Sequence, residues 1–313
     1  MITFDNTCKS YQGQSAIANL NLHIARGELV VLLGPSGSGK STALKMINRM
    51  VDHDGGRILF DGREIYSFAV RDLRRRMGYA IQSVGLFPHW TVARNIATVP
   101  QLLGWPAQRV QARVTELLNL FAMEPEQYRD RYPHQLSGGQ QQRVGVARAL
   151  AADPDVLLMD EPFGALDPVT RAALQLELKR VHQSSGKTIV LVTHDIDEAL
   201  LLATRIVLLR QGRVAQVGTP LELLSQPAND FVADFLGRAD LGLKLLSLRP
   251  LAPWVQPLTG PVPATSVTDT ATVRDALSQM AAHGVTALRV HDASGQTVGQ
   301  VQATALLQAR PHA

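Results

Sequence analysis

The residues best suited to chemistry form a glycine-rich loop that reads Gly34-Pro35-Ser36-Gly37-Ser38-Gly39-Lys40-Ser41-Thr42. It fits the pattern GxxxxGK[ST], which binds nucleotide phosphates when it lies between a strand and a helix. Glycines let backbone N–H groups point at phosphate oxygens, and the following helix adds the positive end of its dipole. We expect Lys40 to reach the β- and γ-phosphates and Ser41 to ligate Mg²⁺. A glycine-rich turn without function is the alternative interpretation.

Two acids and a histidine have the residue types needed for hydrolysis. The apolar run Val156 to Met159 ends in Asp160 and Glu161, whose side chains point to opposite faces if the run is a strand. We expect Asp160 to hold Mg²⁺ through water and Glu161 to orient and activate the attacking water. A second apolar run, Thr188 to Thr193, delivers His194, which can reach the γ-phosphate because ligands gather at the carboxyl ends of strands. Each pattern alone favours a structural role, and only their combination indicates catalysis.

A second anion site is predicted where the chain reads Leu136-Ser137-Gly138-Gly139-Gln140. This segment precedes a strongly helical stretch, Gln141 to Ala151. Unpaired N–H groups and the helix dipole both favour phosphate at the start of a helix.

These residues need a sheet to position them. Short β-branched runs such as Leu29 to Leu33 alternate with helical patterns from Ile2 to about Leu209, which predicts an α/β fold with a mainly parallel sheet. Apolar residues then recur at helical spacing, at Val110, Val114, Leu117, Leu118 and Phe121. This spacing indicates a helical subdomain over about residues 85–152, inserted into the sheet domain.

The sequence changes character after Asp240. Five prolines between Pro250 and Pro263 predict a linker over 239–264, between a main domain over 1–238 and a small α+β domain over 265–313. In this last part the spacing predicts a helix over Thr272 to His283, strands over Thr286 to His291 and Thr297 to Val301, and a helix over Ala303 to Ala309.

Composition narrows the class of protein. The 313 residues are 45% hydrophobic and 19% charged, which is typical of packed globular domains. The net charge is +4, but the densest basic run, from Arg71 to Arg76, has no interleaved aromatic residues and favours a solvated helix face over a nucleic-acid site.

Apolar runs fall short of the roughly 18 residues of a membrane helix. The single cysteine, Cys8, and the absence of a secretory signal pattern fit a reducing cytoplasm.

The phosphate-binding loop, the LSGGQ segment and the strand ending in Asp-Glu together resemble the ATPases of ABC transporters, over residues 1 to about 240. The resemblance implies a P-loop fold, ATP and Mg²⁺ as cofactors, and a homodimer in which LSGGQ of one subunit caps ATP on the loop of the other. It also assigns roles to single residues: Tyr11 stacks on adenine, Gln82 senses Mg²⁺ and the permease, and Asp167 links the two sites. One chain alone would therefore be a poor enzyme.

The permease is expected to be a separate set of membrane subunits, as in bacterial uptake systems that also use a solute-binding protein. Gly85 to Trp90 follows Gln82 where the family docks its permease, although core packing of Phe87 and Trp90 is an alternative. The resemblance therefore places the chain at the cytoplasmic face of the inner (plasma) membrane.

The segment from Phe235 to Pro250 is similar to glycine betaine, carnitine and choline uptake ATPases. Members of that group often end in paired CBS domains, whereas the tail here resembles at most one such unit. An amino acid or polyamine importer stays open as an alternative, and so does a soluble ABC ATPase acting on nucleic acid. The latter usually carries coiled-coil insertions or two cassettes, which are not found here.

Overall fold

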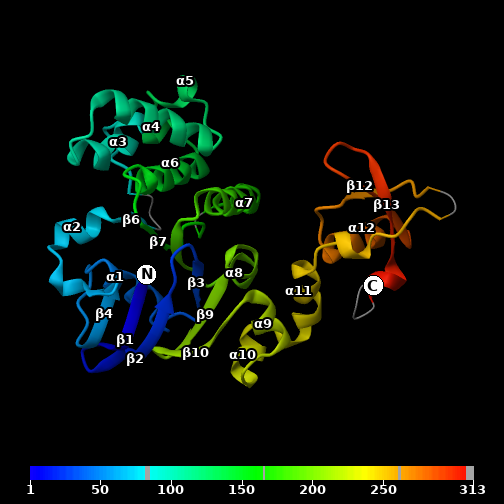
Figure 1. The fold of residues 1–313 in the computed structure, drawn as a ribbon, viewed down its shortest axis with the longest axis horizontal. Helices are drawn as coiled ribbons and strands as arrows, with labels where there is room; N and C mark the ends of the chain where they lie inside the picture. Colours follow the sequence, from blue (N-terminus) through cyan, green and yellow to red (C-terminus); the bar gives the residue numbers. More distant parts are fainter. Residues whose placement is uncertain (82–84, 165, 260–261, 308–313) are drawn as a thin grey trace. The chain divides into compact units, whose positions relative to one another are not determined.

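The computed structural model describes residues 1–81, 85–164, 166–259 and 262–307. It divides into two compact units, Met1–Pro220 and Leu221–Ala313 (Figure 1). In these ranges, none of the helices combines the length and the apolar character needed to cross a membrane.

A six-stranded sheet forms the centre of the first unit. Its strands, in sheet order, are β10 (Arg213–Gly218), β9 (Arg205–Arg210), β3 (Leu29–Leu33), β8 (Thr188–Val192), β7 (Val156–Asp160) and β6 (Met77–Ala80). All neighbours are parallel except β10 with β9. Every residue of β3 and β8 is buried, which explains their uninterrupted apolar sequence. The predicted parallel sheet is confirmed, and the carboxyl ends of β3, β8 and β7 lie at one edge.

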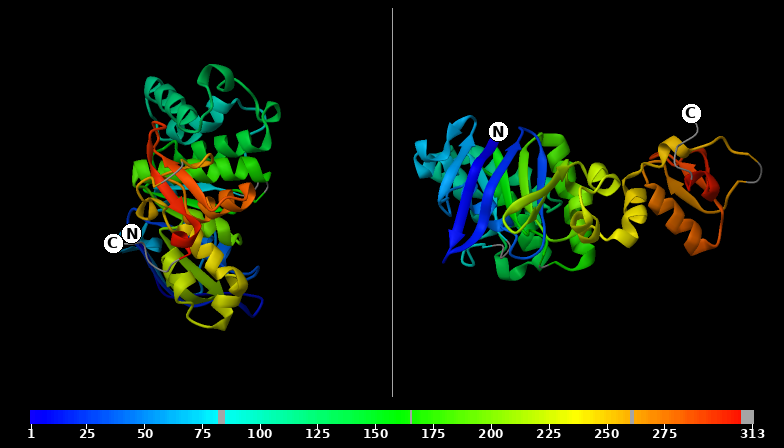
Figure 2. Two further views of the ribbon diagram at one scale, coloured as in Figure 1. Left: turned by 90° about the vertical axis from the view of Figure 1, so that its right-hand side faces the viewer. Right: turned by 90° about the horizontal axis from the view of Figure 1, so that it is seen from below.

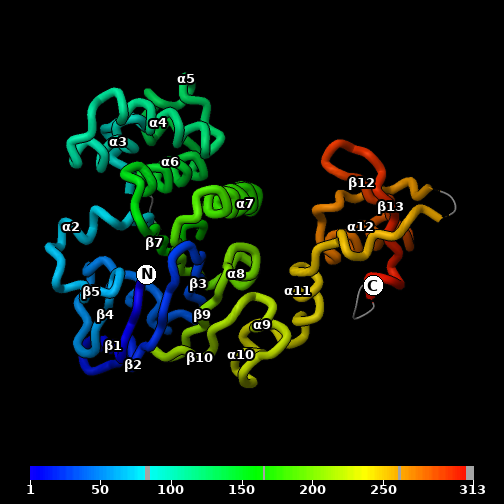
Figure 3. Tube along the Cα trace, in the orientation of Figure 1, coloured from blue at the N-terminus to red at the C-terminus, as the bar shows by residue number. Residues whose placement is uncertain are grey.

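An antiparallel sheet packs on the same core. It consists of β2 (Gln14–Ile24), β1 (Ile2–Tyr11), β4 (Gly55–Phe60) and β5 (Arg63–Glu64), in that order. Figure 2 shows β1 and β2 side by side in dark blue, and Figure 3 traces β4 and β5 next to them. Helix α1 (Lys40–Ile47) buries Leu44 and Ile47 in one apolar cluster with Phe4, Phe60 and Leu32, so both sheets hold the helix that follows the glycine-rich loop.

Helices occupy the region where the sequence predicts a helical subdomain. They are α3 (Val92–Leu102), α4 (Ala107–Leu120), α5 (Pro125–Tyr128) and α6 (Gly138–Leu150), with the short turn η2 (Pro133–Gln135) before α6. Figure 1 shows them gathered above the sheets. The apolar stripe of α4 is buried as its spacing predicts, at Val110, Val114, Leu117 and Leu118.

The remaining helices of the first unit flank the strands. They are α2 (Val70–Arg75), preceded by η1 (Ile65–Ser67), α7 (Pro168–Ser185) and α8 (Ile196–Leu202). Helices α7 and α8 follow β7 and β8, so their amino ends begin at the edge of the sheet where the acids and His194 lie.

The second unit has its own core. Its helices are α9 (Pro220–Ser225), α10 (Asp230–Phe235), η3 (Arg238–Asp240), α11 (Leu241–Leu248), η4 (Ala252–Trp254), α12 (Val273–His283) and α13 (Ala303–Leu306). The sheet β11 (Ser266–Thr268), β12 (Ala287–His291), β13 (Thr297–Gln302) is parallel between the first two strands and antiparallel between the last two. The predicted helix and strands between Thr272 and Val301 are therefore present.

The segment 239–264, predicted as a linker, contains helix α11 and part of this core. Leu251 and Trp254 are 0% and 5% exposed among the apolar side chains that pack on α12. Gln256 exchanges two backbone hydrogen bonds with Gln300, which extends the small sheet. Proline density misleads here because Pro253 lies in the first turn of η4, where a missing N–H removes no helical hydrogen bond.

Candidate nucleotide-binding and hydrolysis site

The glycine-rich loop wraps around the buried side chain of Lys40. Gly39 precedes α1 with φ at 99°, and a Cβ at this position would lie 2.4 Å from the carbonyl oxygen of Ala16. Only glycine fits such a conformation and approach. Lys40 is 6% exposed, and its Nζ donates hydrogen bonds to the carbonyl oxygens of Gly34 (2.7 Å) and Pro35 (3.0 Å). Burial lowers the pKa of Lys40, while Glu161 and Asp160 oppose that shift.

The loop lines a hollow of about 340 Å³ that is wide enough for phosphate groups. Its walls come from Tyr11 at the end of β1, Ala16 of β2, residues 36–42 and Glu161. Tyr11 is 47% exposed, so its ring is available to a planar group such as a base. The structure therefore brings Tyr11, the loop and Glu161 together around one hollow.

The two acids at the end of β7 have different partners. Ser41 Oγ donates a 2.7 Å hydrogen bond to Asp160 Oδ1, and Lys45 Nζ lies 3.8 Å from Asp160 Oδ2. Glu161 has left-handed backbone geometry, with φ at 44°, and its N–H donates to the carbonyl oxygen of Val192. A non-glycine residue in this region is strained by about 1–3 kcal/mol, and such strain concentrates at functional sites.

His194 faces Glu161 across the adjacent strand ends. Its Nδ1 lies 3.3 Å from Glu161 Oε1, and its side chain is 62% exposed against 25% for Glu161. This proximity follows from the register of β7 on β8, in which Asp160 pairs with Val192. The chain thus places a carboxylate and an imidazole together at the edge that bears the phosphate loop.

The donors around Ser41 fit Mg²⁺. Ser41 and Asp160 offer a hydroxyl and a carboxylate oxygen 2.7 Å apart, and Mg²⁺ prefers oxygen ligands while keeping waters and substrate phosphates. Among the described residues no three His, Cys, Asp or Glu side chains form a metal-binding group, so a cage built by protein alone is not offered there. Gln82, the third predicted ligand, lies outside the described residues.

The LSGGQ segment begins α6 through a reciprocal cap. Ser137 Oγ accepts a hydrogen bond from the Gln140 N–H (3.3 Å), and Gln140 Oε1 accepts one from the Ser137 N–H (2.9 Å). Leu136 is buried and anchors the turn, whereas Gly138 is exposed. Among the described residues, none that lines the loop hollow comes from this segment, so the two predicted phosphate sites of one chain do not meet there.

Asp167 caps helix α7 next to this segment. Its carboxylate accepts a 3.1 Å hydrogen bond from the Thr170 N–H, and hydrogen bonds from Thr170 lower the pKa of Asp167. Thr170 in turn packs against Gly139, since a Cβ on Gly139 would lie 2.2 Å from Thr170 Cγ2. The lack of a side chain at Gly139 of α6 therefore allows the first turn of α7 to pack closely against it.

This contact leads to a test of the packing. We expect Gly139→Ala to destabilise the chain by about 1–3 kcal/mol, because the added methyl overlaps Thr170. The double variant Gly139→Ala with Thr170→Ser removes the overlapping methyl and should recover most of the loss. Thermal unfolding measures the loss of stability, and equal losses in the single and double variants would contradict the assignment.

Some residues of the site are not apparent from sequence patterns. Lys45 near Asp160, and Arg171, Gln175 and Glu198 beside the His194 turn, are identified only by their contacts. The only signal for Glu198 is its position three residues after the helix cap Asp195, where a capping partner is common.

Comparisons with known proteins agree with this geometry. A family model described as ABC transporter matches residues 17–164. The chain is 57% identical to the glycine betaine uptake system ATP-binding protein YehX of Escherichia coli (strain K12), over 98% of this chain and 99% of YehX. It is 47% identical to the glycine betaine/carnitine/choline transport ATP-binding protein OpuCA of Bacillus subtilis (strain 168), over 100% of this chain and 81% of OpuCA.

A solved structure with a similar fold is the dimeric post-hydrolysis state of the ATP-binding cassette MJ0796 bound to ADP and Pi. It has a TM-score of 0.63 and 34% identity, and the match covers 70% of this chain and 99% of the cassette. The P-loop ABC ATPase fold is therefore confirmed. With relatives of this identity matched over nearly their whole length, the chain belongs to the ABC transporter family, as an ATP-binding and ATP-hydrolysing subunit that requires ATP and Mg²⁺.

Proposed function

We propose that this chain energises the uptake of an osmoprotectant, such as glycine betaine, choline or carnitine, by an ABC importer. The observation that carries the proposal is the identity of 57% to a glycine betaine uptake protein across nearly the whole of both chains. The similarity includes the second unit, which the family model does not reach.

Each side chain of the site has a distinct part in this proposal. The loop N–H groups and Lys40 hold the phosphates, since Lys40 exchanges its two carbonyl acceptors for phosphate oxygens. Bound Mg²⁺ would be held by Ser41 and Asp160 and would neutralise phosphate charge. Glu161 accepts the proton of the attacking water and orients it, and His194, within 3.3 Å of Glu161, fixes the γ-phosphate position. Gln82 would complete the Mg²⁺ ligands.

A second copy completes the site. The LSGGQ segment lies outside the loop hollow of its own chain, so its helix start is available to the ATP of a partner. The relative MJ0796 is dimeric in its structure with ADP and Pi. We infer a homodimer with two composite sites, in which Asp167 of each protomer lies between them.

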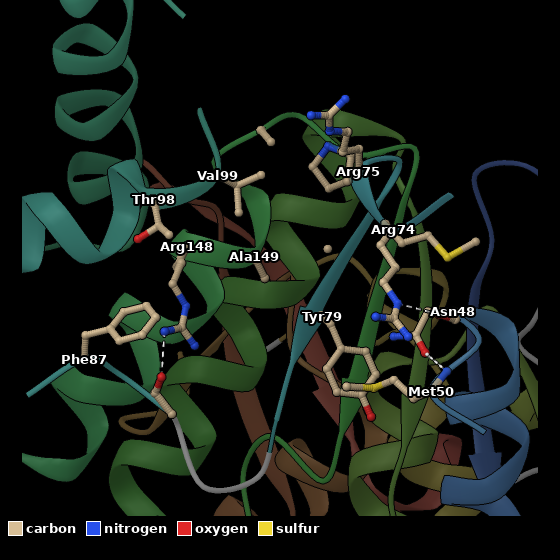
Figure 4. A pocket seen from close by; sticks show the side chains of 15 residues that line it. Asn48, Met50, Arg74, Arg75, Tyr79, Phe87, Thr98, Val99, Arg148 and Ala149 are labelled. Carbon is tan, nitrogen blue, oxygen red and sulfur yellow. Dashed lines mark hydrogen bonds between the residues drawn. The ribbon is translucent and has the colours of Figure 1, made fainter. Parts of the chain in front are cut away.

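The permease would dock in a groove between α2, β6, α3 and α6. A cavity of about 410 Å³ is lined there by Arg74, Arg75, Tyr79, Phe87, Val99 and Arg148, among others (Figure 4). Phe87 is 44% exposed and packs against Trp90 in a tilted arrangement, with ring centroids 4.3 Å apart, so it is not a core residue. A half-exposed aromatic beside an apolar hollow fits a short helix of a membrane subunit.

The cytoplasmic face of the inner membrane is the location that follows from this arrangement, with a solute-binding protein acting through the permease. The second unit begins at Leu221, and its apolar core includes Leu251 and Trp254. We also propose that this core forms a small CBS-like domain, which packs or dimerises. The three-stranded sheet with α12 supports this domain.

Uptake assays test the choice of solute. Cells that lack other osmoprotectant systems and carry this chain with its permease and binding protein should accumulate labelled glycine betaine or choline. The same cells with the Lys40→Ala chain serve as the control. Accumulation of only a rival solute, such as an amino acid or a polyamine, would overturn the proposed cargo and leave the ATPase assignment intact.

A further inference from the structure

The turn that carries His194 is closed by its own hydrogen bonds. Asp195 N–H donates to Thr193 Oγ1 (3.0 Å), and Asp195 Oδ1 accepts from the Glu198 N–H (3.0 Å) at the start of α8. Thr193 N–H donates to the carbonyl oxygen of Leu32 on β3. These bonds fix the turn to the sheet, but they do not connect it to the helix on its other side.

That connection is made by Glu198, a carboxyl group that the proposed hydrolysis does not use. Glu198 is 4% exposed, and its Oε2 accepts a 3.3 Å hydrogen bond from Gln175 Nε2 of α7. One turn earlier on α7, Arg171 Nη1 lies 3.7 Å from Asp195 Oδ2. Two contacts one helical turn apart therefore join α7 to the His194 turn.

The same carboxyl group borders the hydrolytic residues. Glu198 lines a small cavity of about 40 Å³ together with Glu161, His194 and Arg171. At its amino end α7 begins at Asp167 and packs through Thr170 on Gly139. A displacement of α7 would thus reach His194 through Gln175 and Glu198.

We propose that Glu198 is a positioning residue for His194, which it holds within reach of Glu161 by joining the turn 193–195 to Gln175 of α7. The inference rests on the proposed ATP hydrolysis at Glu161 and His194. Glu198 acts only through His194 and does not itself contact the nucleotide.

The protonation of Glu198 provides a second measurement, which is the pH dependence of the chain's stability. Burial, with Asp195 acting in the same direction, raises the pKa of Glu198 from 4.5 to about 7, while Gln175, Thr193 and Arg171 oppose the shift. Across the cavity the facing groups are Glu161 and His194. The fold favours the neutral carboxyl, so its contribution to stability is complete below pH 4.5 and is lost as the pH rises through about 7.

Kinetics of the full-length chain test the proposal. We expect Glu198→Leu to lower kcat about 10-fold or more with KM for ATP unchanged, because misplacing a reacting group affects the chemical step and not nucleotide binding. Gln175→Leu should act in the same direction. Glu198→Gln, whose neutral amide has the shape of the protonated carboxyl, should keep kcat within about twofold and lose the decline in stability between pH 4.5 and about 7.

A matched control separates positioning from stability. Glu28 directly precedes β3, at the end of that strand opposite the glycine-rich loop. Its carboxylate accepts a 2.7 Å hydrogen bond from the Ala25 N–H and lies 3.2 Å from Arg205 Nη2. We expect Glu28→Leu to lower the melting temperature without lowering kcat. Wild-type kcat in Glu198→Leu, or an equal loss of kcat in Glu28→Leu, would overturn the inference. Absence of hydrolysis by the wild-type chain would instead overturn the proposed function, and this inference with it.

Discussion

Glu161→Gln should bind ATP and nearly stop hydrolysing it. The carboxylate lies 3.3 Å from His194 and at the rim of the phosphate hollow, where it can take a proton from water. Glutamine keeps the size and loses the basicity, and general-base catalysis is worth roughly 100- to 10,000-fold in rate. We expect kcat to fall by at least about 100-fold with ATP affinity retained, so that ATP accumulates in a stable dimer. Phosphate release and size-exclusion chromatography with ATP measure these two effects.

The control for this variant is Glu116→Gln on α4, whose carboxylate pairs with Arg113 at the surface. It should hydrolyse ATP at the wild-type rate. Hydrolysis by Glu161→Gln at the wild-type rate would remove Glu161 from its role as the base.

Lys40→Ala should lose nucleotide affinity. Lys40 is the buried cation of the loop, and its Nζ is held by two carbonyl oxygens at the base of the phosphate hollow. Charge-assisted hydrogen bonds to a ligand contribute about 1.5–3 kcal/mol, which corresponds to about 10- to 100-fold in affinity. Titration with a fluorescent ATP analogue measures the loss.

Lys187→Ala is the matched control, because Lys187 pairs with Asp153 and lines no part of the hollow. It should bind ATP like the wild type. An unchanged titration for Lys40→Ala would contradict the phosphate assignment of the whole loop. Loss of folding can be excluded from the thermal unfolding of the same variants.

The sequence predicts the centre of the site because local pattern and topology agree there. Gly34 to Ser41 lies between an apolar strand and a helix, and parallel strands must deliver Asp160, Glu161 and His194 to one edge. The spacing within the loop, together with the tendency of ligands to bind at the carboxyl ends of parallel strands, is sufficient to predict these positions.

Other features depend on contacts between distant segments, which no local pattern contains. The Gln175 to Glu198 bond joins two helices through side chains that look like ordinary surface residues in sequence. Likewise, Trp254 lies in a proline-rich stretch and yet is buried, because its partners come from α12 and β12. Tertiary packing overrides the composition of the segment in both cases.

In the proposed homodimer, two copies trap ATP between the Lys40 loop of one and the Ser137 helix start of the other. A crystal or cryo-electron microscopy structure of Glu161→Gln with ATP and Mg²⁺ tests it most directly. We expect Ser137 and Gly139 of the second protomer to contact the γ-phosphate of ATP bound at Lys40. A nucleotide-bound assembly in which these two elements are far apart in every pair of protomers would contradict it.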